Sequence, residues 1–234
     1  MLLVVPGVFA FWGGGPQNDT NELLAQLFGK TTAFTATGNV AVKGRTGREK
    51  NGAELQYSFL DGKMLVGVDV TKTKKGAKLA NEMSVVAGMG MGEIIVLIRP
   101  DKKAAYTILP GAKSYCEHKP TVATHDNAKP KIERTELGRE EIDGHPCVKS
   151  KVVITDANGK SSTVIAWAAT DMNEFPLKSE MESDGDTVVT TFKNVKFEKP
   201  AAALFELPEN FARYESVQDM MMQSMQRMMQ GGRE

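Results

Sequence analysis

The residues of this sequence best suited to metal or redox chemistry are its two cysteines, because a histidine stands two positions from each. Cys116 is followed by His118 in SYCEH, and His145 precedes Cys147 in EEIDGHPCVK. Thiolate and imidazole are ligands of tetrahedral zinc, and residues i and i+2 of a strand share a face. These four side chains are therefore one candidate metal site, although neither spacing is the usual zinc knuckle.

A disulfide between Cys116 and Cys147 is the interpretation that we favour over a metal site. In an exported protein, as the N-terminal apolar run considered below suggests, two cysteines near predicted strand ends are typical of a bridged pair. Closing a loop of about thirty residues would stabilise the fold by about 3–4 kcal/mol through the entropy of the unfolded chain. Two unpaired structural thiols are the remaining alternative.

The C-terminal stretch SVQDMMMQSMQRMMQGG contains six of the 13 methionines. Met221, Met222, Met225, Met228 and Met229 recur at spacings of three and four, which predicts an amphipathic helix with one apolar stripe. Such a helix could pack on a sheet or pair with a second copy. Its methionines also suit an adaptable surface for an apolar partner, or thioether binding of copper(I).

The sequence contains no recognisable catalytic motif. It lacks the patterns of a nucleophile elbow, a phosphate-binding P-loop or a zinc protease, and three histidines leave little material for a triad. The glycine-rich stretch GMGMGE follows a predicted helix and precedes a strand, the reverse of the dinucleotide-binding order. We therefore expect a protein that is not an enzyme and that needs no cofactor.

Composition narrows the choice of partner. The 29 basic and 29 acidic residues cancel, and no basic run suits a phosphate backbone, which argues against nucleic acid.

The first fifteen residues, MLLVVPGVFAFWGGG, include an apolar run of signal-peptide length, although no basic residue precedes it. A cleaved signal is the favoured reading of residues 1–15, and a buried segment or a short anchor is the alternative. The protein is expected in the periplasm or secreted.

Periodicity predicts a sheet with a few helices. Helical spacing and caps indicate helices over residues 18–30 and 78–89. Apolar runs separated by turn residues indicate hairpins that turn at Asp61-Gly62, Pro100-Asp101, Asn158-Gly159 and Asp184-Gly185. The connections are short, so neighbouring strands should be antiparallel. The fold class expected is α+β, with about nine to eleven strands in one curved antiparallel sheet and helices on its concave face.

Four segments in a fixed order carry a resemblance to a known family. They are IIVLIRPDKKAAYTILPGAKSY, TELGREEIDGHPCVKSKV, PLKSEM and AAALFELPENFARY, and the resemblance that they carry covers residues 34–214. This order resembles an uncharacterised bacterial domain family related to the outer-membrane lipoprotein carrier (LolA-like) superfamily. The chain departs from the family at GKMLVGVDV, where the family usually has another basic residue after the turn.

The resemblance implies an unclosed half-barrel over residues 18–214, followed by a Met-rich tail at 215–234. In the carriers, the concave side holds the acyl chains of a lipoprotein. We therefore expect a non-enzymatic binding protein for an acyl chain, a lipoprotein lipid or another apolar ligand, with a hinge near GMGMG. The alternatives are an envelope interaction or stress protein that docks a partner through its tail, and a periplasmic protein that binds copper or zinc. Alternating apolar residues are the expected cavity liners, namely Ile95, Leu97, Tyr106, Ile108, Val164 and Ala166.

Overall fold

The computed structural model describes residue 28 and residues 31–72, 87–118, 131–155, 161–183 and 185–220, together with residues 159, 222, 223 and 226. The expected leader at 1–15 lies outside these residues. So do the expected helix at 18–30, apart from residue 28, and most of the helix at 78–89.

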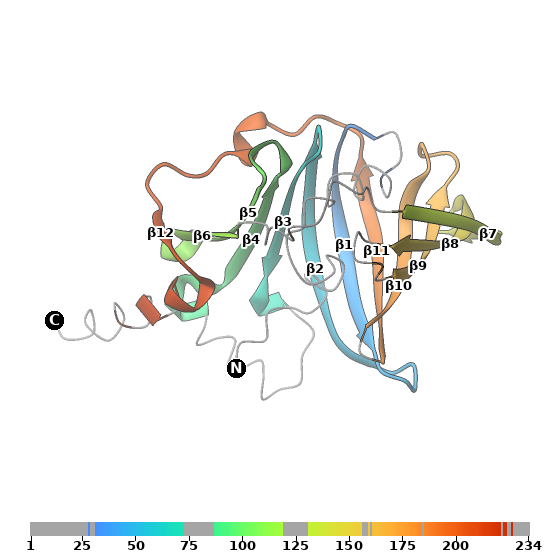
Figure 1. The fold of residues 1–234 in the computed structure, drawn as a ribbon, viewed down its shortest axis with the longest axis horizontal. Helices are drawn as coiled ribbons and strands as arrows, with labels where there is room; N and C mark the ends of the chain where they lie inside the picture. The colour runs from blue at the N-terminus through green and yellow to red at the C-terminus, as the bar shows by residue number, and fades with distance from the viewer. Residues whose placement is uncertain are drawn as a thin grey trace.

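One sheet of 12 strands forms the body of the protein (Figure 1). Its strands in chain order are β1 (Ala33–Lys43), β2 (Glu49–Leu60), β3 (Lys63–Asp69), β4 (Glu93–Arg99), β5 (Ala104–Leu109), β6 (Ser114–His118), β7 (Lys131–Ile142), β8 (His145–Thr155), β9 (Ser161–Ala169), β10 (Phe175–Ser183), β11 (Asp186–Lys196) and β12 (Ala212–Tyr214). All neighbours are antiparallel except β12 and β6, which are parallel.

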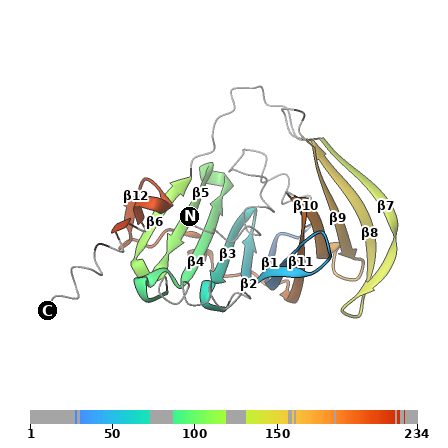
Figure 2. The same ribbon diagram turned by 90° about the horizontal axis from the view of Figure 1, so that it is seen from below.

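The chain builds the sheet outward from its middle and then returns from the far edge. The spatial order is β12-β6-β5-β4-β3-β2-β1-β11-β10-β9-β8-β7, so β1 lies between β2 and β11. Strands β6 and β7 follow each other in the chain but lie towards opposite edges of the sheet (Figure 2). Segments close in sequence on either side of residues 119–130 are therefore far apart along the sheet.

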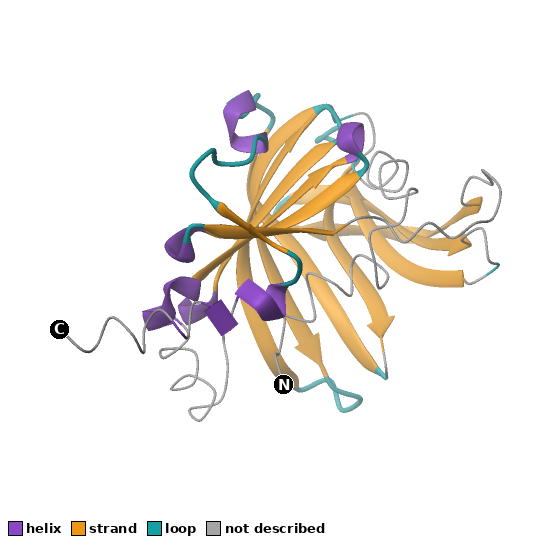
Figure 3. Cartoon of the chain, turned by 60° about the vertical axis from the view of Figure 1, so that its left-hand side comes forward, coloured by secondary structure: helices purple, strands orange, loops and turns teal. Residues whose placement is uncertain are grey.

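The helical segments described are short and lie mainly at strand ends (Figure 3). They are η1 (Val70–Lys72), η2 (Ala87–Met91), η3 (Pro100–Lys102), η4 (Pro110–Ala112) and η5 (Ala202–Phe205), together with a helical turn that begins at Val217. Within the described part of the chain the protein is mostly β. The expectation of an α+β fold with helices covering the concave face is not supported there, because these turns connect strands instead of covering them.

The sheet is strongly curved, and ring contacts identify its concave face (Figure 2). The rings of Phe34 on β1 and Phe175 on β10 are 4.9 Å apart between centroids, although β11 lies between these strands. Side chains of strands that are not neighbours approach one another on the inner side of a curved sheet. Phe28 packs on the same side, with its ring against Phe34, Phe59, Phe175 and Phe192. The middle of the concave face is thus an aromatic cluster.

A segment between β11 and β12 closes part of the opposite, convex face. Phe205 of η5 is fully buried among side chains of β1, β2, β4 and β5. The Arg99 guanidinium donates to the Phe205 carbonyl and forms ion pairs with Glu206, at 2.9 Å, and with Asp101, at 2.8 Å. These contacts join the segments IIVLIRPDKKAAYTILPGAKSY and AAALFELPENFARY, two of the four that carry the family resemblance. We call the contacts of Arg99, Phe205 and Glu206 the latch.

The glycine-rich stretch before β4 makes a close backbone contact. Gly90 has a φ of 75°, and a Cβ there would lie 2.7 Å from the Gly111 carbonyl oxygen of η4. Only glycine combines this conformation with such an approach. The contact fixes η2 against η4 and so places Met91, which follows Gly90, in a buried cluster.

Candidate functional site

The concave face carries an apolar row that crosses five strands. Residues paired across neighbouring strands point to the same face, so the row can be followed from pair to pair. It consists of Val152 on β8, Val164 on β9, Met181 on β10, Val188 on β11 and Val42 on β1. Val42 is an even number of positions from Phe34 and packs against the same cluster, which places the row on the concave side. We call these five residues the concave apolar row.

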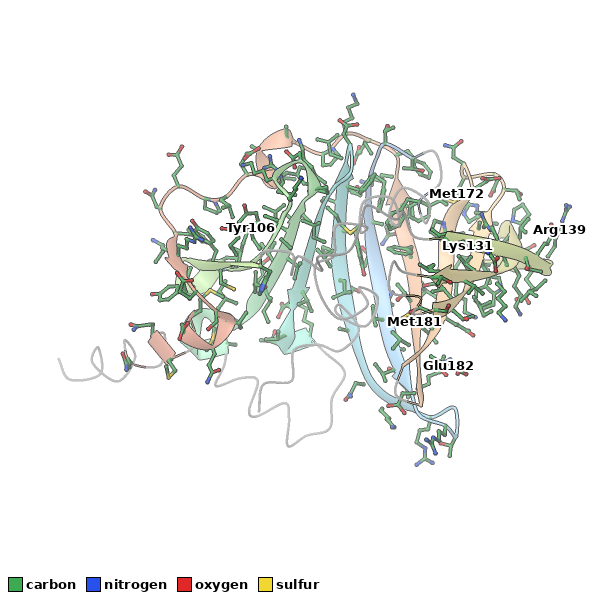
Figure 4. All side chains as sticks on the ribbon, viewed as in Figure 1. Tyr106, Lys131, Arg139, Met172, Met181 and Glu182 are labelled. Atoms are coloured by element: carbon green, nitrogen blue, oxygen red, sulfur yellow. The ribbon has the colours of Figure 1, made fainter. Side chains whose placement is uncertain are left out.

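The side chains beside this row are small. Ser150, Ala166, Ser179 and Thr190 form the next row of pairs over β8 to β11, and all four are buried. Within the concave apolar row, Met181 and Val42 are only partly buried. Figure 4 labels Met181 on β10. This part of the concave face therefore combines a row of apolar side chains with a neighbouring row of small ones, and most of both rows is buried.

The positively charged side chain of Arg134 lies at the outer end of the concave apolar row. Arg134 on the edge strand β7 pairs with Val152, so it shares the face of the row. Its side chain is exposed, and no ion pair of Arg134 is found among the residues described. The row therefore runs from an apolar centre to an unpaired positive charge at the rim of the sheet.

The expected cavity liners do not share one face. Leu97 pairs with Leu65, Leu65 with Ser58, and Ser58 with Thr35, the neighbour of Phe34 on β1. Leu97 therefore lies on the convex face. The same rows of pairs place Ile95, Tyr106 and Ile108 there too, in or against the cluster that contains Phe205. Only Val164 and Ala166 lie on the concave face. The six residues cannot line a single cavity, and four of them belong to the convex core.

The stretch EEIDGHPCVK is a hairpin and not a metal site. Asp143 and Gly144 have φ angles of 49° and 82° and form the turn between β7 and β8. The Cys147 thiol donates to the His145 carbonyl at 3.4 Å, and His145 Nδ1 lies 2.8 Å from an Asp171 carboxylate oxygen. Cys147 and His145, the two residues of this stretch with possible metal chemistry, thus have hydrogen-bond partners within the protein.

The predicted disulfide is wrong, because Cys116 and Cys147 are both free and buried. Cys116 is on β6 and Cys147 on β8, and β5, β4, β3, β2, β1, β11, β10 and β9 lie between them in the sheet. The alternative metal site of Cys116, His118, His145 and Cys147 fails for the same reason. Within the described part of the chain, no three His, Cys, Asp or Glu side chains gather closely enough to hold a metal ion.

Cys116 and His118 nevertheless form a compact pair on the concave face near the opposite edge. His118 Nε2 lies 2.8 Å from the Thr107 hydroxyl and 3.5 Å from the Cys116 sulfur. Burial raises the pKa of the Cys116 thiol and lowers the pKa of His118, so both side chains are neutral at pH 7. A protonated and fully buried thiol is a poor nucleophile, which argues against cysteine catalysis at this pair.

The Met-rich tail begins as a capped helical turn. The Ser216 hydroxyl accepts from the Asp219 amide at 3.1 Å and donates to the Asp219 carboxylate at 2.7 Å, which is N-terminal capping. Met220 is fully buried against Met91, Leu109 and Cys116, whereas Met222 is 54% exposed. The rest of the predicted stripe lies outside the described residues. The methionine that anchors this turn is thus Met220, one position before the predicted stripe.

Sequence reasoning also missed a charged cluster on the convex side of the sheet. Trp167 donates to Glu140 at 2.8 Å, and the ammonium groups of Lys178 and Lys149 lie 4.1 and 4.9 Å from its ring centroid. Hydrogen bonds from Lys149 and then Trp167 hold the pKa of Glu140 below its usual value. Glu140 and the two lysines therefore surround the buried Trp167.

Comparison with known proteins rests on structure alone, because no family model and no curated protein matches the sequence. A LolA superfamily protein from Nitrosomonas europaea aligns over 80% of this chain and 96% of its own, at 13% identity and a TM-score of 0.36. LprF from Mycobacterium bovis aligns over 85% of this chain and 100% of its own, at 15% identity and a TM-score of 0.39. MucB of Pseudomonas aeruginosa, in complex with MucA, aligns over 82% and 62%, at 13% identity and a TM-score of 0.38.

These three alignments combine identities of 13–15% with TM-scores below 0.4, and the family resemblance drawn from the sequence motifs stays a prediction. Among the helices that the structure describes, none has the length and apolar character needed to cross a bilayer.

Proposed function

We propose that this protein is a non-enzymatic, exported binding protein that holds an acyl chain along the concave apolar row. The observation that carries this proposal is the row itself, in which apolar side chains from five strands end at the exposed Arg134. Strands lie about 4.8 Å apart, so the row extends over about 19 Å, a length that suits an extended chain. Burial of apolar surface would supply the affinity.

The position of Arg134 favours a ligand with an anionic head. A carboxylate or phosphate at the rim would pair with the guanidinium, which matches both groups with two parallel hydrogen bonds. The chain of the ligand would then run inward along Val152, Val164 and Met181. A fatty acid and a phospholipid share this chemistry, and either would lie in the same direction.

A chain-length series of fatty acids tests the apolar part of the proposal. Each added methylene that becomes buried contributes about 0.8 kcal/mol, so the Kd should fall about fourfold per methylene until the row is filled. Displacement of a fluorescent fatty acid measures these constants. A Kd that does not change with chain length would contradict binding along the row.

Matched variants locate the site. Met181→Gln, on the concave face, should weaken binding of the longest chain, whereas Ile165→Gln, on the convex face of the neighbouring strand, should not. Arg134→Gln should weaken binding of the fatty acid but not of the alcohol of equal length. Lys151→Gln, which removes an exposed charge from the other face of β8, is the control for overall charge.

The exposed Met222 supports a second candidate function, docking of an apolar partner through the Met-rich tail. This alternative predicts that the protein binds no fatty acid and that truncation after Tyr214 abolishes the interaction. Displacement of the fluorescent fatty acid distinguishes the two functions, because only the first requires a ligand on the sheet.

A further inference from the structure

Soft metal ligands gather on the concave face where β6, η2 and the tail meet. The thiol of Cys116 and the thioethers of Met91 and Met220 belong to one buried cluster, and each of the three side chains is at most 3% exposed. His118 follows two positions after Cys116 on the same face of β6 and is only partly buried. Three separate segments of the chain thus bring three sulfur side chains and an imidazole together.

The one distance that defines this cluster fits a shared metal ion. The Cys116 sulfur and His118 Nε2 are 3.5 Å apart. Two ligands bound tetrahedrally, with metal–sulfur about 2.3 Å and metal–nitrogen about 2.0–2.1 Å, are also separated by about 3.5 Å. His118 Nε2 therefore already lies at the separation from the Cys116 sulfur that coordination requires, and a bound ion would replace its 2.8 Å hydrogen bond with the Thr107 hydroxyl.

The ligand types select the metal. Thioether and thiolate sulfur prefer copper(I) over harder ions, and a bound metal deprotonates a coordinating thiol outright. We propose that Cys116, His118, Met91 and Met220 form a copper(I) site that ties the start of the Met-rich tail to β6. This site lies at β6, near one edge of the sheet, whereas the concave apolar row crosses β8 to β1. The copper site therefore does not depend on the proposed acyl-chain binding.

The test is a competition for copper(I) between the full-length protein and bicinchoninate under anaerobic, reducing conditions. The wild type should remove one copper(I) per chain from the coloured complex. Cys116→Ser should weaken this binding by at least about 100-fold, because loss of a ligand costs more than the 10–100-fold typical of outer partners. Met220→Leu, which nearly conserves side-chain volume, should weaken it by at least about tenfold.

Two controls separate this site from other sulfur in the chain. Cys147→Ser removes the other buried thiol, and Met222→Leu removes an exposed thioether of the same helical turn, so neither should change copper affinity. X-ray absorption at the copper edge should show one nitrogen and several sulfur neighbours in the wild type. Equal binding by the wild type and Cys116→Ser would overturn the proposal, as would a preference for zinc or no binding at all.

Discussion

The latch on the convex face gives the sharpest test of how the fold is held together. Phe205 is fully buried among side chains of four strands, so Phe205→Ala would leave a cavity in the convex core. Truncation of a buried phenylalanine to alanine costs about 3–5 kcal/mol. With an m-value near 3 kcal/mol per molar, the urea midpoint should fall by about 1–1.7 M.

The neighbouring Leu204 provides a matched control for this prediction. It lies in the same turn but is 49% exposed, so Leu204→Ala should change the free energy of unfolding by no more than about 0.5 kcal/mol. Equilibrium urea unfolding followed by tryptophan fluorescence measures both variants. If the two variants lost equal stability, η5 would not be docked as the structure shows, and the account of the latch would be refuted.

Three further predictions follow from the described contacts. Hydrogen bonds from Arg99 and Lys102 hold the pKa of Glu206 below its usual value. The stabilisation of the fold by Glu206 is therefore complete above the unfolded-state pKa of about 4.3, and it is lost as the pH falls through the lower folded-state pKa. The difference in urea midpoint between wild type and Glu206→Gln should therefore vanish on acidification; a difference that persists at pH 2 would contradict it. Gly90→Ala should destabilise the fold by about 1–3 kcal/mol in thermal melts, whereas Gly88→Ala, which meets open space, should be neutral; equal effects would count against the contact of η2 with η4. Both thiols should resist a thiol reagent in the native state and react after denaturation, with no mass change on reduction; a gain of about two mass units on reduction would restore the disulfide.

The local pattern of the sequence predicted the strands better than it predicted their faces. The turn at Asp61-Gly62 is confirmed, with φ angles of 48° and 84° between β2 and β3. Strand β4, EIIVLIR, is apolar on both faces, because Ile94 and Val96 point to the concave side and Leu97 to the convex core. Alternation therefore carries no information about its orientation, and the liners assigned from β4 and β5 fell on the wrong face.

The edge strand β7 was hard to predict for the opposite reason, because it is polar on both faces where β4 is apolar on both. Strand β7, KIERTELGREEI, has one neighbour and hardly any buried side chain, so it shows no apolar period. Its charges are what an exposed edge strand requires to avoid pairing with another chain.

The cysteines illustrate a third limit of the sequence. Cys116 and Cys147 are close in sequence, but the chain changes from one edge of the sheet to the other between them. Only the order of the strands reveals that separation, and no local spacing encodes it.

The central claim, that the concave face holds an acyl chain, is tested most directly by native mass spectrometry of the full chain exported to a bacterial periplasm. The account predicts a fraction of the protein with extra mass that a solvent extract identifies as a lipid or fatty acid. That mass should decrease in Arg134→Gln and remain in Lys151→Gln. A clean protein mass that stays unchanged after incubation with fatty acids and phospholipid vesicles would contradict the account.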